Sequence, residues 1–525
     1  MKHAIRSMSL LATALILVAC EGDVGLKGED GFDSLVATRA IDKGDADCAG
    51  GGVALDSGLD TNRNGILDSG EVTASEFLEC ATAPRLRALH ASTDAPLVNI
   101  LVDGVAVVSD VDFTQGTGFL PVAERPNVQV EAILPESTLA VIDEDLILDF
   151  NTDYTVLAVG TVAGATAPVR PLIIENPTDQ RLTPGSLAAQ VVHAAASAPP
   201  VDVYVTTFGA VLSASAPVND VPLAYEASTE RRELVAGDYQ IRVTLAGQPD
   251  AVVYDSGELP LAAGADLLIA AVDNTGPGAA EVKLVVMDGT GVATLLADGT
   301  PAAVTAVHAS PDAGTVDILA DIESTANDEA LPLARNVNFT DVCRIGQVPA
   351  PDTYTINIAE SANNASIPLS IPGVAVAPGV QYTAVVSGFA LGGLPALTAL
   401  PPLVTDSRSV ATQAKLRVIH ASPSTGDVDV YLLPAGTVFN DPMVIPSATL
   451  VFGGDTGVIP VTTPANYDVY VTPAGDKSIV AIQIPNLPLN GGEVWDVFAR
   501  DPLAIEGALP QAQVIDYAAV ADCTL

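Results

Sequence analysis

The chain has 525 residues, more than one hydrophobic core usually serves, and this length predicts about three to five domains. Hydrophobic residues make up 49% of the sequence but aromatic residues only 4%, so the cores must consist mainly of aliphatic side chains. The 64 acidic residues outnumber the 22 basic ones and give a formal net charge of -42. Such a field repels phosphate backbones and anionic lipid headgroups, which excludes nucleic-acid binding and direct docking on anionic membranes.

The amino terminus has the features of a targeting segment. Lys2 and Arg6 precede an apolar run from Ser7 to Val18 that is too short for a permanent transmembrane helix, and the run ends at Ala19-Cys20. This pattern resembles a bacterial lipoprotein signal peptide, and the resemblance implies cleavage after residue 19 and a lipid on Cys20. The alternative is an ordinary secretory peptide with an incidental cysteine. We expect a signal peptide at 1–19 and an acidic, glycine-rich tether at 20–35.

A short segment resembles the calcium loop of EF-hand proteins. Hard cations need many oxygen ligands, and this loop alternates oxygen-bearing side chains around Gly65, which permits a sharp turn. The expected calcium ligands are Asp60, Asn62, Asn64, Ile66 through its carbonyl, Asp68 and Glu71. The alternative is an ordinary Asx-glycine turn. The flanks do not look like two helices, so we expect a free-standing loop of weak affinity.

Cysteines surround this loop. With Cys20 lipidated, Cys48 and Cys80 are the natural disulfide pair, and closing a loop of this size stabilises by roughly 3–4 kcal/mol in the chain-entropy model. The resulting module, at 36–82, resembles a small module near the start of other bacterial lipoproteins. Cys343 and Cys523 are candidates for a second disulfide that joins the last two domains, the alternative being two free thiols.

A sequence motif recurs four times in the remaining chain. In every copy a His-Ala dipeptide is followed, nine residues after the His, by an Asp or Asn within an alternating apolar strand. The pairs are His90 and Asn99, His193 and Asp202, His308 and Asp317, and His420 and Asp429. Successive copies start 103, 115 and 112 residues apart, which is the size of a domain.

Each copy contains about seven short alternating strands separated by turn residues, with no convincing long helix. We therefore predict an all-β chain of about four tandem immunoglobulin-like β-sandwich domains. The expected boundaries are 83–182, 183–298, 299–410 and 411–525.

The phrase His-Ala-Ser-Pro-Asp followed by Val-Asp-Ile, at His308 to Ile318, resembles the bacterial domain-of-unknown-function family numbered 4397. The resemblance covers nearly all of residues 84–525, and copies three and four match best. Copy two departs from the pattern, because it has Ala195-Ala196 in place of Ser-Pro. The resemblance implies fold and a secreted or envelope address, and no chemistry.

The repeated histidines invite a catalytic or metal-binding interpretation. Each copy has only one His and no second His or Cys nearby, so a transition-metal site lacks ligands. We instead predict that each His meets its Asp or Asn across a first hairpin and fixes its register. No common hydrolase, metalloprotease or nucleotide-binding motif is present.

These patterns predict a non-enzymatic cell-envelope lipoprotein, held at the outer membrane or cell surface through its lipid. A rod of β-sandwich domains would serve adhesion, scaffolding or capture of a protein or glycan, with calcium as the cofactor and no nucleic-acid partner. One alternative is a periplasmic structural or binding lipoprotein. Another is a secreted hydrolase, which needs a catalytic cluster that the sequence does not reveal.

Overall fold

The computed structural model describes residues 31–164, 167–178, 180, 182–323, 331–503 and 509–525. The predicted signal peptide, Cys20 and most of the predicted tether lie outside the described residues. Within the described residues, no helix is long and apolar enough to cross a membrane. Among these described residues the chain forms two compact units, one within residues 31–81 and the other within residues 82–525.

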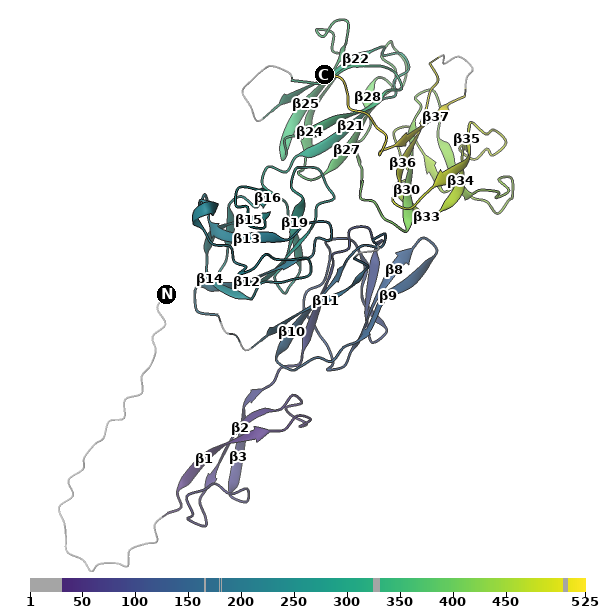
Figure 1. The fold of residues 1–525 in the computed structure, drawn as a ribbon. Helices are drawn as coiled ribbons and strands as arrows, with labels where there is room; N and C mark the ends of the chain where they lie inside the picture. Colours follow the sequence, from purple (N-terminus) through teal and green to yellow (C-terminus); the bar gives the residue numbers. More distant parts are fainter. Residues whose placement is uncertain (1–30, 165–166, 179, 181, 324–330, 504–508) are drawn as a thin grey trace, which may run out of the picture. The chain divides into compact units, whose positions relative to one another are not determined.

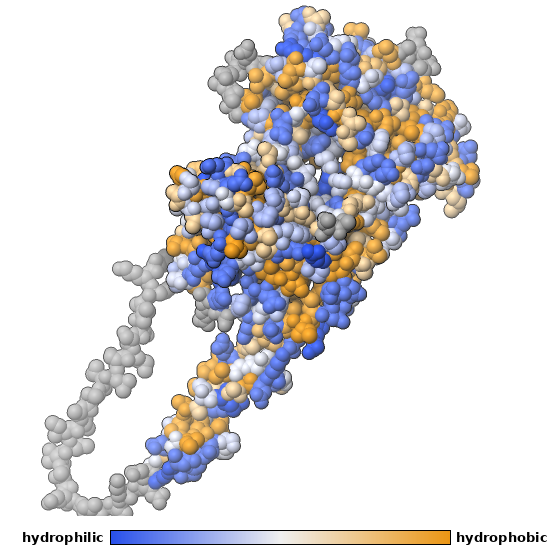
Figure 2. All heavy atoms as spheres, viewed as in Figure 1, coloured by the Kyte–Doolittle hydropathy of each residue, from blue (hydrophilic) through white to orange (hydrophobic). Residues whose placement is uncertain are grey.

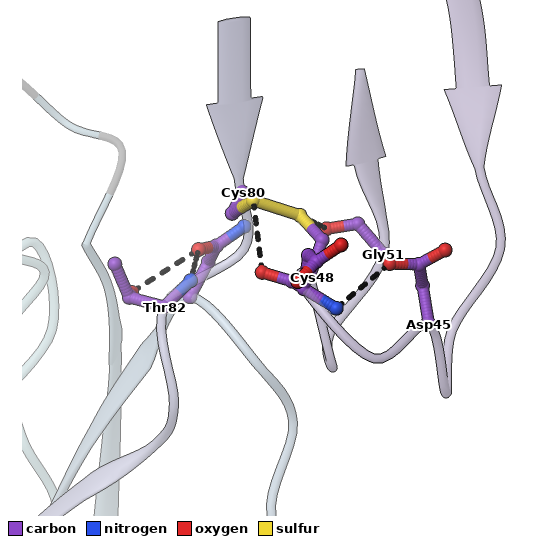
Figure 3. Close-up of a disulfide and its surroundings, with 7 residues drawn as sticks. Asp45, Cys48, Gly51, Cys80 and Thr82 are labelled. Carbon is purple, nitrogen blue, oxygen red and sulfur yellow. Dashed lines mark hydrogen bonds between the residues drawn. A yellow bond between two sulfur atoms is a disulfide. The ribbon is translucent and has the colours of Figure 1, made fainter. Parts of the chain in front are cut away.

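The first unit is a three-stranded antiparallel sheet in the order β1-β2-β3 (Figure 1). Its strands are β1 (Ser34–Ile41), β2 (Gly52–Leu59) and β3 (Val72–Cys80). Only Ile41, Cys48 and Ala54 form its buried apolar cluster, so the core is very small. The predicted disulfide between Cys48 and Cys80 is confirmed, and it joins the β1–β2 loop to the end of β3 (Figure 3). A covalent link compensates for the small apolar area that this sheet buries.

The first repeat forms two four-stranded sheets, in the orders β11-β10-β4-β7 and β6-β5-β8-β9. Its strands are β4 (Arg85–His90), β5 (Val98–Val102), β6 (Val105–Val111), β7 (Leu120–Pro121), β8 (Asn127–Leu134), β9 (Ser137–Asp145), β10 (Thr152–Val159) and β11 (Arg170–Pro177).

The second repeat forms a five-stranded sheet, β14-β12-β18-β19-β20, and a four-stranded sheet, β13-β15-β16 with β17 beside β15. Its elements are β12 (Ser186–His193), β13 (Val201–Thr207), the short 3-10 helix η1 (Leu212–Ala214), β14 (Arg232–Val235), β15 (Gly237–Leu245), β16 (Val252–Asp255), β17 (Leu259–Leu261), β18 (Asp266–Asp273), β19 (Val282–Met287) and β20 (Val292–Leu295).

The third repeat forms the sheets β24-β21-β27-β28, with β29 also paired to β27, and β23-β22-β25-β26. Its strands are β21 (Ala302–His308), β22 (Val316–Ile322), β23 (Leu331–Val337), β24 (Val342–Val348), β25 (Asp352–Glu360), β26 (Leu369–Val376), β27 (Gln381–Ser387), β28 (Thr398–Ala399) and β29 (Leu403–Val404).

The fourth repeat forms the sheets β33-β30-β36-β37 and β32-β31-β34-β35. Its strands are β30 (Gln413–Ala421), β31 (Val428–Pro434), β32 (Ala448–Leu450), β33 (Ile459–Thr462), β34 (Ala465–Pro473), β35 (Ile482–Leu489), β36 (Val494–Arg500) and β37 (Gln511–Asp516). The all-β class is therefore confirmed, with eight or nine strands per repeat among the described residues instead of about seven.

The strand that carries the motif His has the same place in every repeat. It pairs in parallel with a later strand, in the pairs β4 with β10, β12 with β18, β21 with β27, and β30 with β36. The next strand in sequence, such as β5 or β22, belongs to the other sheet. The chain therefore crosses between sheets immediately after each His.

Side chains from both sheets share one buried cluster in the second and fourth repeats. The first and third repeats differ, because the corresponding cores are each divided into two smaller clusters. Successive side chains of a strand point to opposite faces of its sheet. Every second side chain therefore points into the space between the two sheets and contributes to these buried clusters.

The repeats also pack against one another in pairs. Leu89 and Leu157 of the first repeat share a buried cluster with Val192 and Leu268 of the second. Residues of the third and fourth repeats, including Ile419, form another such cluster. The prediction of a simple rod of successive domains is therefore wrong for these pairs, since the outer faces of their His-bearing sheets are buried against each other. Figure 2 shows both hydrophilic and hydrophobic residues on the visible face of residues 82–525.

Two further links hold distant parts of this unit together. The disulfide between Cys343 of β24 and Cys523 is confirmed, and the final segment runs beside β24 with hydrogen bonds from Arg344 N to Ala521 O and from Cys523 N to Arg344 O, 2.8 Å each. Arg408, in the segment between the third and fourth repeats, binds the first repeat. Its guanidinium is 2.8 Å from Ala95 O and 2.5 Å from Asp112 Oδ1.

Candidate functional site

The predicted calcium loop joins β2 to β3, so strands and not helices flank it, as the sequence indicated. Asp60 is 3% exposed and Glu71 is 8% exposed, whereas the residues between them are exposed except for the half-buried Leu67. The Asp60 carboxylate accepts hydrogen bonds from Asn64 N at 3.0 Å and Gly65 N at 2.8 Å. These bonds hold the turn, in which Gly65 has φ +78°.

The other end of the loop is held by Glu71. Its Oε1 accepts hydrogen bonds from the Thr61 hydroxyl at 2.7 Å, Thr61 N at 2.8 Å and Asn62 N at 3.1 Å. The Thr61 hydroxyl, together with the backbone N–H groups of Asp68, Asn62 and Thr61, lowers the pKa of the Glu71 carboxyl and keeps it ionised.

The donor set suits a hard cation, which takes about six to eight oxygen ligands. Asp68 accepts hydrogen bonds from the amides of Asn62 at 2.7 Å and Asn64 at 2.9 Å, so these amides present nitrogen to it. Among the described residues, no three His, Cys, Asp or Glu side chains converge as a bound metal would require. A cation would therefore need both amides to rotate and the carboxylates to draw together.

The four motif histidines occupy one repeated environment. Each Nε2 faces a carbonyl oxygen six residues later, at 3.0 Å for His90, 3.1 Å for His193, 2.9 Å for His308 and 3.0 Å for His420. A carbonyl only accepts, so Nε2 carries the proton. In three repeats Nδ1 accepts the backbone N–H two residues on, from Ser92, Ser310 and Ser422. In the second repeat, where Ala195 replaces this serine, His193 Nδ1 is buried without a hydrogen-bond partner.

An aromatic side chain completes each environment. The His ring meets an aromatic ring edge-on, with centroids 6.2–6.4 Å apart, in the pairs His90–Phe113, His193–Tyr225, His308–Phe339 and His420–Phe452. The residue after each aromatic has positive φ and donates its N–H to the His carbonyl. Those residues are Thr114, Glu226, Thr340 and Gly453. The fold therefore brings the aromatic residue and the residue after it back to the His of the same repeat, a contact that the sequence did not indicate.

Burial lowers the pKa of all four imidazoles. With exposed fractions of 0–2%, the rings are almost fully shielded from solvent and are neutral near pH 7. Their hydrogen bonds hold the crossing between the sheets, which is a structural role.

The predicted hairpin pairing of each His with its Asp or Asn is wrong. His90 lies on β4 and Asn99 on β5, and these strands belong to different sheets; the same holds for the other three pairs. The turn residues at Thr93–Pro96 are compatible with a hairpin and also with a crossing between two sheets. The nine-residue spacing between His and Asp or Asn therefore did not distinguish the two connections. Each acidic partner has its own role: Asp202 accepts from Gly247 N at 2.7 Å, and Asp429 from Gly475 N at 2.8 Å. Asp317 accepts from the Ser361 hydroxyl at 2.6 Å.

The third repeat contains a cavity of about 400 Å³ between its two sheets. Its walls are aliphatic except for His308, Tyr354 and Tyr382. No residue predicted as a site from the sequence, apart from His308, lies on its wall.

The comparisons with known proteins support the predicted repeats in part: they give three matches that end at residue 431, whereas the resemblance was expected to cover nearly all of residues 84–525 in four copies. The family described as Domain of unknown function (DUF4397) matches residues 84–204, 211–319 and 302–431. The family described as Domain of unknown function (DUF7151) matches residues 33–79, the first unit's sheet and loop. No curated protein matches the chain.

Proposed function

Because the chain belongs to the family described as Domain of unknown function (DUF4397), whose description assigns no activity, we propose from its own residues that it is a non-enzymatic cell-envelope protein. The paired β-domains would serve adhesion, scaffolding or capture of a protein or glycan. The observation that carries this proposal is the position of the four histidines. They are the residues best suited to acid–base work at neutral pH, yet all are buried, neutral and hydrogen-bonded to backbone.

We propose that each repeat is an immunoglobulin-like sandwich. The support is that Leu187 of one sheet and Ile241 of the other belong to one buried cluster in the second repeat. An experimental structure in which the two sheets of a repeat do not face each other would rule this out.

The proposed address rests on the sequence around Cys20. Two measurements test it: metabolic labelling with an alkyne fatty acid, and protease shaving of intact cells. We expect label on the wild type and none on Cys20→Ser, and release of peptides from residues 84–525. Absence of label on the wild type contradicts the lipid anchor. Labelling without release by protease places the protein in the periplasm and favours the structural alternative.

We also propose that the Asp60–Glu71 loop binds calcium weakly. The support is that Asp60 and Glu71 already fix the turn through backbone hydrogen bonds, and that the loop carries further side-chain oxygens on Asn62, Asn64 and Asp68. Calcium at about 100 times its dissociation constant would stabilise the first unit by about 2.7 kcal/mol.

Calorimetric titration of the full chain with calcium, alongside Glu71→Gln, tests this proposal. We expect one equivalent of calcium to bind the wild type and at least tenfold weaker binding to the variant, because Glu71 would supply two oxygens. Asp47→Asn, outside the loop and exposed, is the matched control for the lost charge. Equal affinity of Glu71→Gln and wild type would refute the site.

A further inference from the structure

We propose that the cavity of the third repeat binds an elongated hydrocarbon chain, such as the tail of an acyl lipid or a long-chain alcohol. The proposal goes beyond the envelope role above and depends neither on the calcium loop nor on the lipid anchor. It rests on the size of the cavity, on its walls, and on the interrupted strand at its edge.

Two small residues lie side by side on adjacent strands at the wall of the cavity. Ala306 of β21 pairs with Ala384 of β27, and both line the cavity. At the same register the second repeat has Val191 beside Ile269. The fourth repeat has Val418 beside Val497 at that register, and both of these repeats have a single undivided core. The third repeat therefore lacks side-chain volume where its neighbours are filled.

Residues that should be fully buried remain partly exposed around this space. Val304, Leu333, Ile345, Ile356 and Val374 point between the sheets and are only half-buried. Apolar side chains left in contact with a void lose their packing partners, and an apolar cavity does not hold water well. An apolar ligand would supply the missing contacts.

The cavity has an edge where a ligand could enter. In the other repeats the strand beside the parallel pair is continuous, as in β19 (Val282–Met287) and β37 (Gln511–Asp516). In the third repeat only the two-residue strands β28 and β29 lie there, separated by Leu400-Pro401-Pro402, which line the cavity. Proline has no N–H to donate to a sheet, so these prolines interrupt the pairing, and solvent reaches Ala384.

The volume and the lining define the ligand class. About 150 Å³ suffices for the six carbons of benzene, so about 400 Å³ has room for roughly ten to sixteen carbons. Aliphatic walls offer almost no polar group to recognise a headgroup, and the net charge of -42 disfavours an anionic one. A chain with an uncharged headgroup fits best.

Titration calorimetry of the full chain with 1-decanol tests the proposal, with decanoate in parallel to distinguish a neutral-headed source from a free fatty acid. We expect one decanol per chain, bound more tightly than decanoate. The variant Ala306→Val/Ala384→Ile copies the packing of the second repeat. We expect it to bind at least tenfold more weakly while unfolding at a higher denaturant concentration.

Ala40→Ile, at an exposed position of β1, is the control for added apolar surface and should bind as the wild type does. If the double variant does not fold, Ala384→Val alone tests the same wall and should still weaken binding. Failure of the folded wild type to bind decanol, or undiminished binding by a folded cavity-filled variant, would overturn the proposal.

Discussion

Replacing His420 with alanine tests the structural role of the repeated histidines most directly. The ring is 0% exposed, its Nε2 donates to Gly426 O at 3.0 Å, and Nδ1 accepts from Ser422 N. Truncation leaves a buried carbonyl and a buried N–H unpaired, at about 1–3 kcal/mol, and removes the edge contact with Phe452, worth about 0.5–1.5 kcal/mol. We expect the free energy of unfolding to fall by about 3 kcal/mol.

The sequence supplies a convenient reporter for this repeat. Trp495, the only tryptophan, lies in β36, which pairs with the His420 strand, so its fluorescence follows unfolding of the fourth repeat in guanidinium. His420→Gln is the matched control, since its amide N–H can still reach the Gly426 carbonyl. We expect it to recover about 1 kcal/mol of the loss.

The pH dependence separates this role from simple loss of volume. Burial lowers the pKa of His420 below its ordinary value of 6.5, so below about pH 6.5 the unfolded chain takes up a proton that the folded chain does not. The contribution of His420 to the free energy of unfolding is complete above pH 6.5. Below that pH it falls by up to about 1.4 kcal/mol per pH unit. His420→Ala should reduce that slope. An unchanged unfolding midpoint together with an unchanged slope would refute the reasoning.

Three further changes test other links in the same unit. Cys523→Ser opens a loop of 180 residues and should lower the stability of residues 82–525 by up to about 5 kcal/mol, measured as a reduced melting temperature of that unit, which reductant lowers in the wild type but not in the variant. Arg408→Ala removes a guanidinium that is 8% exposed and leaves the Ala95 carbonyl without its partner, which should cost about 1–3 kcal/mol. Arg335→Ala should cost less, because this guanidinium is 40% exposed and Asp317 keeps its hydrogen bonds from Ser361 and Asn336, and equal effects would contradict this ranking. Gly453→Thr places a side chain at φ +82°, and we expect chemical denaturation to show a loss of about 1 kcal/mol, whereas Thr340→Gly, at φ +76°, should be neutral or stabilising.

Much of the architecture could be predicted from the sequence because it depends on local patterns. Period-two alternation and turn residues predict strands without any tertiary information, and the spacing of His90, His193, His308 and His420 predicts a domain-sized repeat. The disulfide between Cys48 and Cys80 also followed, because few cysteines leave few pairings.

The calcium loop shows where such reasoning stops. Its residue order was readable from the sequence, and the structure adds that Asp60 and Glu71 fix the turn through backbone N–H groups. Whether a cation draws the remaining oxygens together depends on side-chain rotations that no sequence pattern encodes.

By itself, the sequence determined that this protein is an acidic all-β chain of domain-sized repeats with a natural disulfide pair in Cys48 and Cys80, and it left the pairing of Cys343 with Cys523 open. Only the tertiary structure decided that the chain crosses between sheets after each His, because a turn of the same composition serves a hairpin or a crossing. The structure also decided that the repeats bury their outer faces in pairs. The cavity beside Ala306 and Ala384 was likewise hidden, since two alanines are unremarkable until the fold places them opposite each other and Pro401-Pro402 interrupts the strand that would cover them. Each of these depends on contacts between residues far apart in sequence, which local periodicity does not specify.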